Sequence, residues 1–260
     1  MIYLLILVSF FEPSNNIKVI VNEQELTESS TVFVRQNDRV DLMTKKQGRW
    51  VFYQPVFREY DNLKNGALTI SEIEYQIKPL KSDLTDQISL KFSSGTYIIG
   101  ISNSDTALST FEPLHLTRKD IIQIVVREED SYLGYLTELI GLPFVLPPKS
   151  LGVYGHQTDL RVGTDCAELA IYGARRMGFN IPYCGPRGIL DYVELTDELK
   201  MGTIIHYGYQ VSVLYEDHGI RGELDNEDLL IHAYQDRVSI EKLGDIELSK
   251  KEYKLYKWKE

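Results

Sequence analysis

The most informative segment of this chain is residues 163–182, which read Gly-Thr-Asp-Cys-Ala-Glu-Leu-Ala-Ile-Tyr-Gly-Ala-Arg-Arg-Met-Gly-Phe-Asn-Ile-Pro. Apolar side chains recur in it at helical spacing, namely Ala167, Ala170, Ile171 and Ala174. Asp165 suits the N-cap of a helix, and Glu168 follows three residues later, as in a capping box. Gly178 suits the position just after a helix. The pattern predicts one helix that begins at or beside Cys166 and packs one side on a core.

The position of Cys166 at a helix start affects the acidity of its thiol. The first helical turn has unpaired backbone N–H groups and the positive end of the helix dipole. Both favour a thiolate, so we expect the pKa of Cys166 to lie below the reference value of about 8.5. A thiolate is the nucleophile that a cysteine hydrolase needs. The alternative interpretation of a single cysteine is a small, buried hydrophobic residue.

Residues 165–169, Asp-Cys-Ala-Glu-Leu, resemble the Asp-Cys-Ser-Gly-Leu signature of the NlpC/P60 family of cysteine peptidases. Further short segments are similar to that family in order and spacing; they are residues 140–145, 178–182, 202–206, 210–215 and 229–233. The resemblance covers residues 132–244. It implies a papain-like α+β unit, in which a helix that carries the cysteine packs against an antiparallel sheet. It also implies cleavage of the peptides of bacterial cell walls.

Carried over position by position, the resemblance makes Cys166 the nucleophile and puts His232 at the third, orienting position. The base histidine of the family falls on Gln210, and a glutamine side chain does not accept a proton at neutral pH. Three interpretations stay open. In the first, His206 supplies the base from the neighbouring strand. In the second, His232 is the base and Gln210 orients it or helps to hold the oxyanion. In the third, the domain is a non-catalytic relative that binds cell-wall peptide.

Candidate substrate-binding residues lie before the predicted helix. Phe144 occupies the position of a tyrosine in the family pattern, so a hydroxyl is lost there. His156 and Asp159 lie in residues 155–159, where they either line a substrate cleft or form a polar turn. Asp165, next to the thiol of Cys166, is the fourth candidate substrate-binding residue.

The leading interpretation is a cysteine peptidase or amidase that attacks an amide carbonyl and forms an acyl-enzyme. An acyltransferase on the same fold differs only in the nucleophile that resolves the acyl-enzyme. The substrate is then a peptidoglycan-type peptide or another small amide, and this chemistry requires no metal or organic cofactor. The histidines are scattered and the two cysteines lack a metal-binding spacing, so we expect no structural zinc site. A formal net charge of −10 disfavours nucleic acid as a partner.

Residues 1–11 form an apolar run that is too short to span a bilayer comfortably. The run is either an export signal, which would place the protein in the periplasm or outside the cell, or a first β-strand of a cytoplasmic protein. No later segment reaches the length of a membrane span, so we expect no integral membrane protein.

Residues 16–116 contain short β-type runs between turn signals, among them residues 17–21, 31–35, 39–43, 88–92 and 96–102. Such spacing predicts an all-β, sandwich-like module.

The expected organisation therefore has three parts. Residues 1–15 are a signal or a first strand, residues 16–116 are the β module, and residues 117–260 are an NlpC/P60-like cysteine hydrolase domain. The expected fold class is α+β, with a C-terminal papain-like domain preceded by an all-β sandwich-like domain. A helix is also predicted over residues 130–140, with Asp130 as its N-cap.

Overall fold

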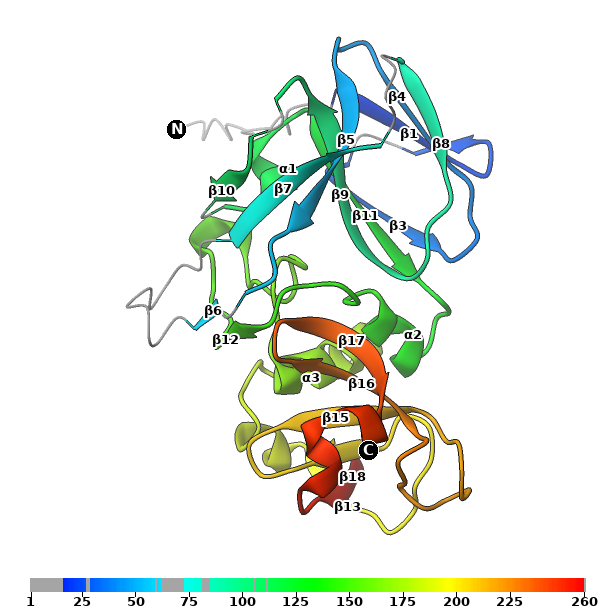
Figure 1. The fold of residues 1–260 in the computed structure, drawn as a ribbon, viewed down its shortest axis with the longest axis vertical. Helices are drawn as coiled ribbons and strands as arrows, with labels where there is room; N and C mark the ends of the chain where they lie inside the picture. Colours follow the sequence, from blue (N-terminus) through cyan, green and yellow to red (C-terminus); the bar gives the residue numbers. More distant parts are fainter. Residues whose placement is uncertain are drawn as a thin grey trace, which may run out of the picture.

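The computed structural model describes residues 16–26, 29–58, 60–61, 73–80, 85–104, 106–110 and 112–259. Two main sheets occupy the N-terminal half of the chain and a third occupies the C-terminal half (Figure 1). The apolar run at residues 1–11 lies outside the described residues. None of the helices in the described ranges combines the length and the apolar character needed to cross a membrane.

The two N-terminal sheets face each other around one core. The smaller sheet has the order β2-β1-β4-β8, with β1 (Ile17–Val21), β2 (Gln24–Glu25), β4 (Val40–Thr44) and β8 (Gln87–Leu90). The larger sheet has the order β10-β7-β5-β9-β11-β3, with β3 (Thr31–Arg35), β5 (Arg49–Pro55), β7 (Ile73–Pro79), β9 (Gly95–Ser102), β10 (Leu108–Thr110) and β11 (Ile121–Arg127). Leu42 and Ile88 of the smaller sheet share a buried cluster with Trp50 and Ile99 of the larger one.

The C-terminal sheet is antiparallel and has the order β13-β18-β14-β15-β16-β17. Its strands are β13 (Val193–Leu195), β14 (Ile204–His206), β15 (Val211–Glu216), β16 (Leu229–Tyr234), β17 (Arg237–Lys242) and β18 (Lys254–Trp258). Helix α3 (Cys166–Arg176) shares a buried cluster with residues of one face, such as Val213 and Ile231. The short 3₁₀ helices η3 (Leu243–Asp245) and η4 (Glu247–Lys250) share another cluster with residues of the opposite face, such as Leu214 and Leu230.

The remaining elements are short and connect these sheets. They are α1 (Leu114–Thr117), α2 (Tyr132–Thr137), η1 (Gly152–Tyr154), η2 (Gly188–Asp191) and the parallel pair β6 (Tyr60–Asp61) and β12 (Val145–Leu146). Strand β11, which follows residue 117, pairs with β9 and β3 of the N-terminal half.

The prediction of an α+β fold, with a papain-like domain after a β-sandwich-like module, is wrong. The protein is mostly β: 40% of it is strand and 16% helix, with only three α-helices among the described residues. The reason is that, among the described residues, only residues 166–176 form a helix of more than two turns. Helices α1 and α2 have 4 and 6 residues, and the rest of the second half is dominated by strands and loops.

Helix α2 is shorter than the helix predicted over residues 130–140, and Asp130 is not its N-cap. Ser131 is the N-cap, and its hydroxyl accepts a hydrogen bond of 3.1 Å from the backbone N–H of Gly134. The carboxylate of Asp130 instead pairs with Arg127 at 2.6 Å. The prediction of Asp130 as the N-cap is therefore wrong, because the carboxylate of Asp130 forms an ion pair with Arg127 instead.

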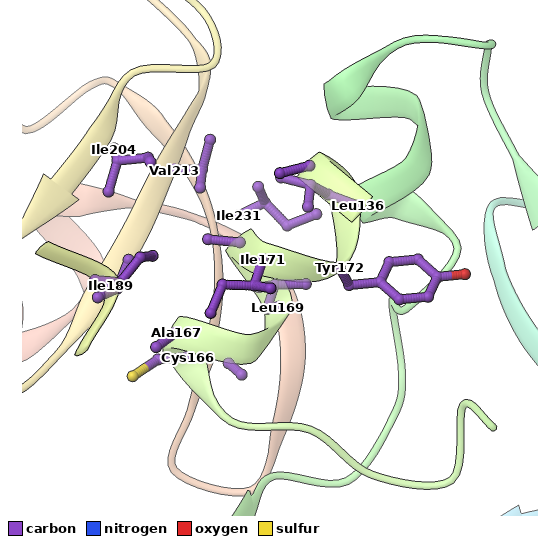
Figure 2. Close-up of a cluster of buried hydrophobic side chains, with 14 of the residues drawn as sticks. Leu136, Cys166, Ala167, Leu169, Ile171, Tyr172, Ile189, Ile204, Val213 and Ile231 are labelled. Atoms are coloured by element: carbon purple, nitrogen blue, oxygen red, sulfur yellow. The ribbon is translucent and has the colours of Figure 1, made fainter. Parts of the chain in front are cut away.

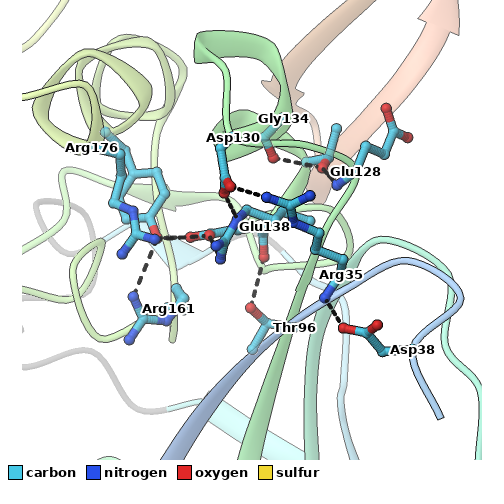
Figure 3. Close-up of polar contacts among 12 residues, drawn as sticks. Arg35, Asp38, Thr96, Glu128, Asp130, Gly134, Glu138, Arg161 and Arg176 are labelled. Atoms are coloured by element: carbon cyan, nitrogen blue, oxygen red, sulfur yellow. Dashed lines mark hydrogen bonds and ion pairs between the residues drawn. The ribbon is translucent and has the colours of Figure 1, made fainter. Parts of the chain in front are cut away.

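A buried carboxylate, that of Glu138, links α2 to α3 and to β11 (Figure 3). It lies 3.1 Å from Nη2 of Arg176 and 3.4 Å from Nη1 of Arg127. The hydroxyl of Tyr172 also donates a hydrogen bond to it. The backbone carbonyl of Glu138 accepts a hydrogen bond of 2.7 Å from the hydroxyl of Thr96 on β9. This network joins the N-terminal half to the helices that support the C-terminal sheet.

Candidate functional site

Helix α3 begins at Cys166, as the sequence predicts, and Asp165 is its N-cap. Oδ1 of Asp165 accepts a hydrogen bond of 2.8 Å from the backbone N–H of Glu168. The capping box is only half formed, because Oε2 of Glu168 accepts a hydrogen bond of 2.6 Å from the hydroxyl of Thr158 in the preceding loop. Both carboxyl groups are buried, so the start of α3 brings two carboxyls and one thiol close together away from solvent.

Cys166 belongs to the core cluster that α3 shares with the sheet, at the first turn of the helix (Figure 2). The residue is only 4% exposed, and its cluster includes Val211 of β15 and Ala233 of β16. Burial raises the pKa of the thiol well above its usual range, and the nearby Asp165 carboxylate adds to this effect. The backbone N–H of Val211 acts in the opposite direction and is outweighed. The predicted low pKa of Cys166 is therefore wrong, because loss of solvent outweighs the helix dipole.

His232 points to the face of the sheet opposite to Cys166. Its neighbours Ile231 and Ala233 belong to the core cluster of Cys166, and side chains alternate between the two faces along a strand (Figure 2). His232 is fully buried, and its Nε2 lies 3.2 Å from Oε2 of Glu241 on β17. The structure does not bring this imidazole together with the thiol.

Gln210 lies directly before β15 and is bonded to the backbone of the sheet. Its Nε2 donates hydrogen bonds to the carbonyl oxygens of Ala233, at 2.9 Å, and of Val211, at 3.3 Å. The buried amide thus closes the end of the β15–β16 pair. This contact gives Gln210 a structural role at the position where the family pattern has a base.

His206, the last residue of β14, has both ring nitrogens bonded to backbone groups. Its Nδ1 accepts a hydrogen bond of 3.0 Å from the N–H of Gly208. Its Nε2 lies 2.7 Å from the carbonyl oxygen of Pro186, which only accepts, so Nε2 carries the proton and donates it. The ring is therefore held between the loop after α3 and the β14–β15 turn. Neither nitrogen is free to take a proton from a thiol.

Phe144 is partly buried against the core cluster of Cys166. Its backbone N–H donates a hydrogen bond of 2.8 Å to the carbonyl of Asp236, and the residue forms an isolated β-bridge with Thr164. The side chain therefore contributes to the core beside α3.

Two predicted substrate-binding residues, His156 and Asp159, meet on the ring of Tyr183. The imidazole of His156 stacks on this ring with centroids 4.5 Å apart and planes inclined by 20°. The hydroxyl of Tyr183 donates a hydrogen bond of 2.6 Å to Oδ1 of Asp159. The guanidinium of Arg175 lies 4.7 Å from the same ring centre. All four side chains are partly exposed, so they form an ordered polar surface beside α3.

His156 connects this surface to the buried carboxyls, because its Nδ1 lies 3.5 Å from Oε2 of Glu168. Burial lowers the pKa of His156. Burial, together with the Asp165 carboxylate, raises the pKa of Glu168 to about 9, and burial raises the pKa of Asp165 to about 6. Glu168 is therefore uncharged at neutral pH. Carboxyl groups with raised pKa values beside a partly exposed histidine are typical of functional sites.

A cavity of about 370 Å³ opens beside His206, and it is lined by Gly185, Pro186, Arg187, Gly188, Gly208 and Tyr209. The imidazole of His206 supports its wall, since two of these residues are its hydrogen-bond partners. Cys184 precedes the lining loop. Burial raises the pKa of its thiol, and the carboxylate of Asp165 contributes. This cavity was not predicted from the sequence, although the glycine spacing of residues 185–188 is a signal for it.

Across the described ranges, no group of three or more His, Cys, Asp or Glu side chains could hold a metal ion. The chemistry of the site is thus that of a buried thiol, two buried carboxyls, a stacked histidine and a glycine-lined cavity. No protein-family model, curated protein or solved structure matches the chain.

Proposed function

We propose that this chain is a peptide-binding protein whose ligand is a short peptide with a free carboxylate, of the type found in bacterial cell walls. In this proposal its thiol is not catalytic. The observation that supports the proposal is the state of Cys166, whose thiol is buried and has a raised pKa. The two candidate bases are engaged elsewhere, His206 with backbone groups and His232 on the other face of the sheet.

These features disfavour a hydrolytic cycle. A cysteine hydrolase needs a thiolate and a base within hydrogen-bond reach, which is about 2.6–3.2 Å. A neutral thiol attacks an amide carbonyl poorly. With Gln210 bonded to Ala233 and Val211, no proton acceptor replaces the missing histidine at that position.

The cavity beside His206 suits a peptide ligand. Gly185 and Gly208 have open space where a side chain would stand, so the backbone of a ligand can approach their own backbone closely. The guanidinium of Arg187 offers two parallel donors for a carboxylate. The ring of Tyr209, which is 60% exposed, offers an apolar surface with a polar tip. The resemblance to NlpC/P60 peptidases supports a cell-wall type of peptide.

A cysteine hydrolase is the second candidate function. It is favoured by the position of Cys166 as the first residue of α3, where unpaired N–H groups stabilise a thiolate once solvent reaches it. The two candidate functions predict different outcomes for the same peptide: a binding protein leaves it intact, whereas a cysteine hydrolase cleaves it.

The test uses the full chain and the tripeptide L-alanyl-γ-D-glutamyl-L-lysine, followed by titration calorimetry and by chromatography of the peptide. We expect saturable binding that Arg187→Gln weakens at least about tenfold. Arg221→Gln, which removes an exposed arginine outside the cavity, should leave the affinity unchanged. We also expect the peptide to remain intact. Cleavage that is lost in Cys166→Ala would establish the hydrolase instead, and absence of binding would reject the proposed ligand.

A further inference from the structure

A second cavity, of about 400 Å³, lies where the larger N-terminal sheet meets the C-terminal half. Its walls come from β5, from β9 and the residues before it, from the turn after α2, and from Arg237 of β17. Figure 1 shows α2 and β17 below these two strands. The cavity shares no lining residue with the one beside His206. Cavities between two parts of a chain are common ligand sites, and this volume falls within their usual range.

The wall of this cavity is rich in aromatic and aliphatic side chains. The rings of Phe52 on β5 and Tyr97 on β9 have centroids 6.0 Å apart, with planes inclined by 42°. Phe57, which follows β5, adds a third ring, and all three rings are partly exposed. Ile98 and Ile140 supply aliphatic surface. Partly exposed rings around one space suit a flat, apolar ligand that packs against their faces and edges.

The hydroxyl groups that β9 and the preceding residues bring to the cavity are already bonded within the protein. The hydroxyls of Ser93 and Tyr97 lie 2.8 Å apart and pair with each other. The hydroxyl of Thr96 donates a hydrogen bond of 2.7 Å to the carbonyl oxygen of Glu138, and that of Ser94 donates one of 3.1 Å to a glutamate carboxylate. This arrangement disfavours a strongly polar ligand such as a sugar, which needs many hydrogen-bond partners.

The charges around the cavity disfavour an ionic ligand. No Asp or Glu is among the lining residues. The guanidinium of Arg237 donates hydrogen bonds of 2.9 and 2.8 Å to the carboxylate of Asp236, and its central carbon lies 4.0 Å from the ring centre of Phe57. Lys78 is exposed, so water solvates its ammonium group. A charged ligand would thus lose hydration without gaining an unpaired, buried counter-charge.

Gln54 supplies one neutral polar group to the wall. It lies two residues after Phe52 on β5, so the two side chains point to the same side of the strand. Gln54 is partly exposed, and its side-chain amide has no hydrogen-bond partner among the described residues. An amide can both donate and accept. A ligand that lies on the ring of Phe52 can therefore place one uncharged polar group against Gln54.

We propose that this cavity binds a neutral, flat aromatic small molecule that carries one hydrogen-bonding group. Its rings pack on Phe52, Phe57 and Tyr97, and its polar group faces the amide of Gln54. The site is separate from the peptide site proposed beside His206, and it does not depend on that proposal.

The probe is N-phenyl-1-naphthylamine, a neutral aromatic amine whose fluorescence rises in apolar surroundings, titrated into the full chain. We expect saturable binding of one dye per chain. The matched probe is 8-anilino-1-naphthalenesulfonate, which has the same rings and a sulfonate. It should bind at least about tenfold more weakly, because the cavity offers its charge no free partner.

Three variants locate the dye. Phe57→Ala removes a ring from the wall and should weaken binding at least about tenfold. Gln54→Leu removes the polar group and should weaken it about threefold. The matched control is Phe179→Ala, which removes a partly exposed ring outside the cavity and should change the affinity less than about twofold. Equal losses in Phe57→Ala and Phe179→Ala would contradict the proposal.

A measurement on the unmodified protein keeps the test independent of whether the variants fold. With isoleucine methyl groups labelled, nuclear Overhauser effects should connect the naphthyl protons of the bound dye to Ile98 and Ile140, which line the cavity. Contacts only to isoleucines outside the cavity would overturn the proposal. Equal affinity for the sulfonate, or no saturable binding of the neutral dye, would also overturn it.

Discussion

The hydroxyl of Thr158 donates a hydrogen bond of 2.6 Å to the carboxyl of Glu168, and this pair is buried at the start of α3. Burial and the nearby Asp165 raise the pKa of Glu168 to about 9 from its ordinary value of 4.5. The folded state therefore holds a proton that the unfolded chain releases above pH 4.5. Stability from this group is fully present below that pH and falls as the pH rises toward 9.

We therefore predict that Glu168→Gln flattens the pH dependence of stability. Between pH 5 and 8.5 the unmodified protein should lose stability relative to the variant, by at most about 1.4 kcal/mol per pH unit. Urea unfolding of both proteins at pH 5, 7 and 8.5 measures this difference. Parallel stability curves would show that the carboxyl ionises normally in the folded state.

The two thiols should differ in reactivity because they differ in burial. Cys166 is buried in the core cluster, whereas Cys184 is partly exposed. In the native protein at pH 8 we expect iodoacetamide to modify Cys184 at least about tenfold faster than Cys166. Mass spectrometry of peptides after timed alkylation measures both rates, and alkylation in urea should remove the difference. Faster modification of Cys166 would mean that its thiol is accessible and ionised.

Glu138 should contribute far more to stability than an exposed carboxylate. Glu138→Gln removes the buried carboxylate that pairs with Arg176 and, together with Asp130, with Arg127, and we expect a loss of about 3–5 kcal/mol. The control is Glu194→Gln, which removes an exposed pair with Lys257 and should change stability by less than about 1 kcal/mol. Denaturant unfolding of the two variants gives the comparison. Equal losses would show that the buried network is solvated.

Local signals predicted α3 correctly, but they did not predict the environment of its thiol. The N-cap Asp165 and the apolar spacing are encoded within a few residues, so the helix start at Cys166 was recognisable. The burial of Cys166 comes from β15 and β16, which follow it by tens of residues. The helix dipole alone favours the thiolate, so a prediction made from the helix alone gives the wrong direction for the pKa shift of Cys166.

The side of the sheet to which His232 points could not be predicted from the neighbouring residues either. In β16 the residues on both sides of the strand are buried, so the apolar pattern around His232 does not tell which side faces α3. The strands at residues 17–21 and 31–35 were easier, because alternating burial along each strand marks the core side. The prediction of the fold class was wrong for a related reason. Pairing between strands that are far apart in the sequence decides how much of the chain becomes sheet.

The two candidate bases offer a last, paired prediction. The ring of His232 pairs with the carboxylate of Glu241 at 3.2 Å, and Glu241 is 46% exposed, so water can replace the imidazole as its partner. His232→Phe replaces a buried polar ring by an apolar one of similar shape, so stability should change by less than about 1 kcal/mol. His206→Phe instead leaves the carbonyl of Pro186 and the N–H of Gly208 without partners, and it should lower the free energy of unfolding by about 1–3 kcal/mol.

The two variants should also differ in ligand binding. Because Pro186 and Gly208 both line the cavity, His206→Phe should weaken binding of the tripeptide, whereas His232→Phe should not. Calorimetric titration and urea unfolding of the two variants measure these effects together. A larger loss of tripeptide binding in His232→Phe than in His206→Phe would show that His232 belongs to the functional site.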